Sequence, residues 1–74
     1  MCLAVPGQIK SIEGETALVD IAGNGIRAMI ALVPEASVGD WVLVHAGLAV
    51  TLLSEEEARE TLELMQEKYS IEDS

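Results

Sequence analysis

Residues 41–53 have the sequence WVLVHAGLAVTLL, in which two β-rich runs flank an Ala46-Gly47 break. Val, Trp and Thr are enriched in strands, and small residues that accept unusual backbone angles mark turns. This stretch therefore predicts two consecutive strands, over residues 41–45 and 48–53. By strict alternation, His45 shares a face of its strand with Leu43 and Trp41.

Three more short runs precede this stretch, each bounded by turn residues. The predicted strands cover residues 8–12, 16–21 and 26–32, with turns at Glu13-Gly14 and Gly23-Asn24-Gly25 and a loop over residues 34–39. Alternation in the second run puts Ala17, Val19 and Ile21 on one face, against Thr16, Leu18 and Asp20 on the other. In the third run Ile26, Ala28, Ile30 and Leu32 share a face, against Arg27 and Met29.

Five short strands within about 50 residues are typical of a small barrel or sandwich. Closure of the sheet removes exposed strand edges, which favours a mainly β fold: a five-stranded OB-like barrel. We expect one domain over residues 1–74, with an N-terminal arm and the barrel in residues 1–53.

The periodicity changes at Ser54. Ser54-Glu55-Glu56-Glu57 matches a capping box, in which Ser54 caps a helix and Glu57 reaches back to it. A C-terminal helix is predicted over residues 54–69, with a short tail over residues 70–74. Ala58, Leu62, Met65 and Tyr69 form its apolar stripe, and the acidic residues form a solvated face to which we assign no chemistry.

The charge is strongly negative, with 13 acidic against four basic residues and a formal net charge of −9. Nucleic acids and anionic membranes are bound by clustered Lys and Arg, so neither is an expected partner. The two aromatic residues, Trp41 and Tyr69, offer no stacking platform for bases. No apolar run approaches the ~20 residues that span a bilayer. A single Cys excludes an intramolecular disulfide, which fits the reducing cytoplasm.

That Cys is the second residue of Met1-Cys2-Leu3-Ala4-Val5-Pro6-Gly7. Removal of Met1 is expected, because the second side chain is small, and it would place a free amine beside the thiol. Pro6 fixes its own φ and biases Val5 toward an extended conformation, so we expect a reactive end held out on a stiff joint. Cys offers a nucleophile or a soft metal ligand. The alternative is that Cys2 is a small buried hydrophobe.

His45 is the only histidine. It is a candidate neutral imidazole ligand, or a base acting on a thiol, and the alternative is a hydrogen-bonded residue at a strand end. One Cys and one His do not complete a four-coordinate zinc site, but they can form a partial site that another protein completes. A Cys–His nucleophilic dyad would make the protein a small thiol enzyme. No oxyanion motif or phosphate-binding loop accompanies it, and a purely structural adaptor is the third possibility.

Three blocks of the sequence together resemble a known family. Residues 1–9, residues 39–49 and residues 55–62 are similar to the HypC/HupF family of nickel–iron hydrogenase maturation chaperones, in the same order and spacing. The resemblance covers nearly the whole chain. The short tail after Tyr69 and the compact loop over residues 32–39 depart from longer family members, away from Cys2 and His45.

The resemblance implies a carrier that is not an enzyme. Its partners would be HypD, where an iron centre with cyanide and carbonyl ligands is assembled, and the precursor of the hydrogenase large subunit. The iron unit, Fe(CN)2CO, would be bound transiently, with no permanent cofactor. The family's essential N-terminal Cys corresponds to Cys2, and its proposed iron-contacting histidine to His45. The partner-binding segment would then comprise Cys2, Leu3, Ala4, Val5, Pro6 and Gly7.

Overall fold

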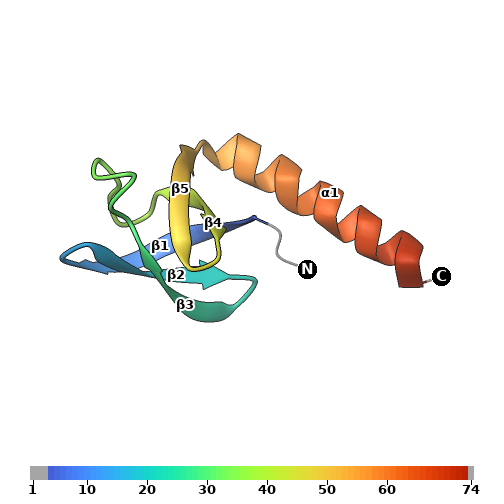
Figure 1. Cartoon of the computed structure of the whole chain (residues 1–74). Helices are drawn as coiled ribbons and strands as arrows, with labels where there is room; N and C mark the ends of the chain where they lie inside the picture. Colours follow the sequence, from blue (N-terminus) through green and yellow to red (C-terminus); the bar gives the residue numbers. More distant parts are fainter. Residues whose placement is uncertain (1–3, 74) are drawn as a thin grey trace.

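The computed structural model describes the backbone of residues 4–73 and the side chains of residues 4–64. Its elements are β1 (Val5–Glu13), β2 (Thr16–Ile21), β3 (Asn24–Met29), β4 (Trp41–His45), β5 (Leu48–Leu53) and α1 (Glu55–Asp73). The strands close into a barrel in the order β1-β2-β3-β5-β4, and α1 runs along and beyond it (Figure 1). The predicted five-stranded barrel with a C-terminal helix is confirmed.

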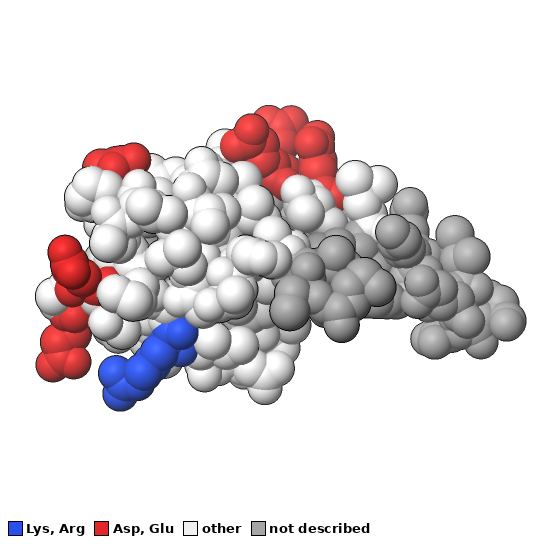
Figure 2. All heavy atoms as spheres, viewed as in Figure 1, with Lys and Arg blue, Asp and Glu red and all other residues white. Residues whose placement is uncertain are grey.

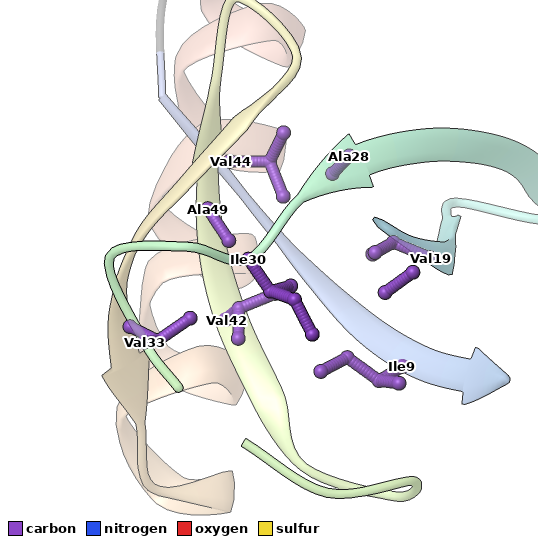
Figure 3. Packing of buried hydrophobic residues seen from close by; sticks show 9 residues of the cluster. Ile9, Val19, Ala28, Ile30, Val33, Val42, Val44 and Ala49 are labelled. Atoms are coloured by element: carbon purple, nitrogen blue, oxygen red, sulfur yellow. The ribbon is translucent and has the colours of Figure 1, made fainter. Parts of the chain in front are cut away.

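The inward-facing side chains of all five strands form one apolar core (Figure 3). The predicted alternation in β2 is confirmed, because Ala17 and Val19 are buried while Leu18 between them is 42% exposed. The fourth and fifth strands have the predicted bounds. The buried core residues are Ile9, Ala17, Val19, Ala28, Ile30, Val33, Val42, Val44 and Ala49.

The first turn lies one residue later than predicted, and the second begins one residue earlier and leaves Asn24 and Gly25 in the following strand. Glu13 pairs with Thr16, so the first turn is Gly14-Glu15. Ile21 pairs with Asn24, so the second is Ala22-Gly23, with φ of 53° and 88°. The reason is that a slip by one residue would turn every core side chain of the strand outward, so burial sets the register.

The third strand begins at Asn24 and ends at Met29, so the predicted range of 26–32 is wrong at both ends. Ile30 and Val33 are buried, but they belong to a turn in which the Val33 amide donates to the Ile30 carbonyl oxygen. Leu32 is 59% exposed. The prediction failed because the turn buries Ile30 and Val33, which are three residues apart, whereas a continued strand would bury every second residue.

The first strand begins at Val5, three residues earlier than predicted. Val5, Pro6 and Gly7 pair with Val44, Leu43 and Val42 of β4, so this part of the expected joint is barrel wall. Pairing of β1 with β2 begins only at Gln8. Residues 5–7 therefore have a strand on one side only, which is where a sheet tolerates proline.

Gly7 is required for packing and not for a turn. A Cβ at this position would clash with Cγ1 of Val19 and would lie 2.8 Å from Cγ1 of Ile21. Both neighbours are branched side chains, and Val19 is fully buried. The barrel closes at this point because residue 7 has no side chain.

The predicted capping box is confirmed. The Ser54 amide donates to Oε1 of Glu57 at 2.9 Å, and the Glu57 amide donates to Oγ of Ser54 at 3.0 Å. The helix continues to Asp73, beyond the predicted end at Tyr69, since no Gly or Pro follows to stop it.

The first turns of α1 lie against the barrel. The helix contacts β1, β4 and β5, and Ala58 is fully buried. Leu62 is half-buried, whereas the side chains of Met65 and Tyr69 lie outside the described residues. No helix in the described range 4–73 combines the length and the apolar character that a membrane crossing requires.

Replacing Gly7 by Ala is expected to lower the free energy of unfolding by about 1–3 kcal/mol, because the new methyl group overpacks the core. Urea denaturation measures this. Gly25→Ala is the matched control, since its Cβ would meet only the flexible end of Leu18, at 3.4 Å. Equal stability changes in the two variants would contradict the close-approach explanation.

Candidate functional site

His45 is the last residue of β4, at the rim of the barrel. It pairs with Leu48 of β5 across the Ala46-Gly47 turn, whose φ angles are 54° and 77°. His45 shares a face with Trp41 and Leu43, as predicted, and because Val42 and Val44 are buried this is the outer face. The tight turn therefore holds an exposed imidazole at the end of a rigid strand.

Nothing in the described part of the chain engages this imidazole. No side-chain hydrogen bond there involves His45. The ion pair between described side chains joins Arg59 to Glu55, 3.7 Å apart on α1. A ligand that binds the His45 ring nitrogens therefore displaces no hydrogen bond or ion pair with a described side chain.

Cys2 lies outside the described residues, and the first described residue, Ala4, follows it by two positions in the sequence. Val5 pairs with Val44, and the same register continued by one residue puts Ala4 opposite His45. Opposed Cα atoms of antiparallel strands are about 4.5–5.5 Å apart. The described chain therefore begins beside His45.

The residues that follow Cys2 divide into two groups. Leu3, like Cys2, lies outside the described residues; Ala4 and Val5 are half-buried, whereas Pro6 and Gly7 are buried. Pro6 is on the outer face with Leu43, and α1 contacts this strand. The partner-binding role of residues 2–7 stays a prediction. In that role, Pro6 and Gly7 would act by holding the preceding residues in position. Sequence reasoning missed the structural role of Pro6 and Gly7, because only their pairing with β4 shows it.

A metal site built from described residues alone is not found. Among them, no group of three or more His, Cys, Asp or Glu side chains is placed to hold an ion. The chain's only thiol, Cys2, is the soft donor that could join His45 at the rim. Two donors leave most of a metal's coordination positions to other ligands.

Two hollows lined by described residues lie elsewhere on the surface. A groove of about 290 Å³ between β4 and α1 is lined by Trp41, Glu55, Arg59, Leu62 and Glu63. A smaller hollow of about 110 Å³ lies on the β1–β2–β3 face and includes Arg27. Sequence reasoning singled out neither, and neither includes His45.

Comparison with known proteins gives a consistent result. The model of the HupF/HypC family matches residues 1–65. "Hydrogenase maturation factor HypC" of Escherichia coli (strain K12) is 41% identical over 97% of this chain and 87% of its own length. The protein of the same name from Synechocystis sp. is 43% identical over 84% and 90%. The "Frd operon uncharacterized protein C" of Proteus vulgaris is 41% identical over 99% and 83%. The matched region contains both Cys2 and the strand that bears His45, and the chain belongs to the HupF/HypC family.

Proposed function

We propose that the protein is an assembly chaperone for nickel–iron hydrogenases. Family membership supports this role, since relatives at about the same identity are named hydrogenase maturation factors. The structural observation that carries the proposal is the placement of an exposed His45 beside the entry of the N-terminal segment into β1. In this proposal a thiol and an imidazole from distant parts of the sequence act together at one end of the barrel.

The cargo in this proposal is an iron unit with two cyanide ligands and one carbonyl, Fe(CN)2CO. Cys2 supplies a thiolate, as iron ligand or docking group, and His45 assists as a neutral nitrogen donor. A thiolate is a soft donor that suits iron carrying such ligands. A reducing cytoplasm keeps the thiol available.

An incomplete donor set favours transfer over storage. Two side chains hold the iron unit only while its own ligands, or those of another protein, fill the remaining positions. The unit would be received from HypD and delivered to the precursor of the hydrogenase large subunit. A carrier needs no substrate cleft, and the two hollows described above lie away from His45.

Cys2→Ala is expected to reduce hydrogenase maturation to the level of a strain that lacks the protein, because no other thiol can replace the ligand. The variant is expected to fold normally, since Cys2 precedes the first strand. The measurement is hydrogenase activity in a complemented deletion strain, with co-purification of HypD and of the large-subunit precursor. Full maturation by Cys2→Ala or Cys2→Ser would reject the thiolate and favour a structural adaptor.

His45→Ala is expected to lower hydrogenase maturation by roughly 10-fold. This is the lower limit of the usual loss of activity when a group that supports a metal site is removed. Co-purification of both partners should persist, since Cys2 remains. Thr51→Ala is a matched control on the neighbouring strand, because Thr51 is also exposed. A His45→Ala strain with the activity of this control would remove His45 from the site.

A further inference from the structure

The strand β3 has an unpaired edge. It pairs with β2 at all six of its residues, but with β5 only through Met29 and Leu48. Five of its six residues are exposed, more than in any other strand of the barrel. The barrel thus closes at one end of β3 and leaves the rest of that edge without a strand in the described part of the chain.

The hydrogen-bond pattern identifies which backbone groups this edge presents. Ile21 and Asn24 close a two-residue loop, so alternate pairs from this point exchange the bonds between β2 and β3. Asn24, Ile26 and Ala28 then face β2, and Gly25 and Arg27 face away. By the same alternation Met29 also faces away from β2, and its amide donates to the Gly47 carbonyl oxygen at 3.0 Å.

The unpaired edge adjoins the proposed cargo site. Gly47 belongs to the turn that follows His45, and it bonds the end of β3. The Ala22-Gly23 turn, the β4–β5 turn and the start of β1 gather at one end of the barrel (Figure 1). A strand added to Gly25 and Arg27 would lie about 4.8 Å from β3 and would run toward the turn beside His45.

Exposed apolar side chains lie along this edge beside one cation, and Asp20, which pairs with Gly25, places an acidic group at the start of the edge. Leu18, Ile26 and Met29 are 42%, 40% and 49% exposed. Arg27 is the single charged residue of β3. Acidic side chains gather over the start of α1 and at the far end of the barrel, and the surface over β5 between them carries none in this view (Figure 2).

We propose that this edge binds an extended segment of the large-subunit precursor, the partner that would take the cargo from Cys2 and His45. The segment would be added to β3 as a further β-strand. The inference rests on the proposed function and names its interaction surface. Backbone groups of Gly25 and Arg27 supply the hydrogen bonds, Ile26 and Met29 take apolar side chains, and an acidic residue of the segment pairs with Arg27.

A second copy of this chain does not fit the edge. Strand β3 contains no acidic residue, so a symmetry-related β3 could not supply a carboxylate to Arg27. Each copy also carries a formal charge of −9, and two copies repel each other. Charge complementarity therefore favours a different protein.

Amide hydrogen exchange tests the inference with the full chain and the purified large-subunit precursor as the probe. In the complex, exchange at Gly25 and Arg27 is expected to slow by about 10-fold or more, because an added strand bonds both amides. Ile26 and Ala28, already bonded to β2, should change less. Unchanged exchange at Gly25 and Arg27 in a formed complex would overturn the inference and leave the proposed function intact.

Variants provide the second measurement. Arg27→Pro removes an amide that faces the open edge, and an edge strand tolerates a proline at such a position. This variant should weaken precursor binding by about 10-fold or more. Arg27→Glu should weaken it as well, while Lys10→Glu, with the same charge change on exposed Lys10, should not. Equal binding by Arg27→Glu and Lys10→Glu would contradict the predicted pairing with Arg27. A wild-type chain that never binds the precursor would overturn both the inference and the proposed partner.

Discussion

The structure depends on the pairing of the first residues of β1 with β4. Val5, Pro6 and Gly7 lie opposite Val44, Leu43 and Val42, and this ladder closes the barrel. The same register brings Ala4, the first described residue, to the end of the strand that bears His45. Barrel closure and the entry of the N-terminal segment beside the imidazole therefore have the same physical cause.

Close packing makes this ladder specific. Gly7 lies against Val19 and Ile21, where a Cβ would not fit. Ile9, two residues later, is fully buried in the core. A small domain buries a limited fraction of its surface, so each such contact carries a large share of its stability. The motif at the start of the chain is thus structural at Pro6 and Gly7, and chemical, in our proposal, at Cys2.

The sequence was sufficient to predict the barrel, the β4 and β5 bounds, the face that His45 shares with Trp41 and Leu43, and the capping box at Ser54. It failed where long-range contacts decide the structure. Residues 5–7 were assigned to a stiff joint outside the barrel because a proline and a glycine resemble a break, and only their pairing with β4 makes them a strand. Ile30 and Leu32 continued the alternation in the sequence, but the chain turns there and leaves Leu32 exposed. The open edge of β3 was invisible, since strand order determines which edges are paired.

Infrared spectroscopy of the anaerobically purified protein tests the central claim most directly, because cyanide and carbonyl ligands of iron absorb where proteins do not. The account predicts these bands on the wild-type chain, their loss from Cys2→Ala, and shifted or weakened bands on His45→Ala. Bands of unchanged position and intensity on Cys2→Ala would contradict the claim that the thiol at the end of the β1–β4 ladder holds the iron unit.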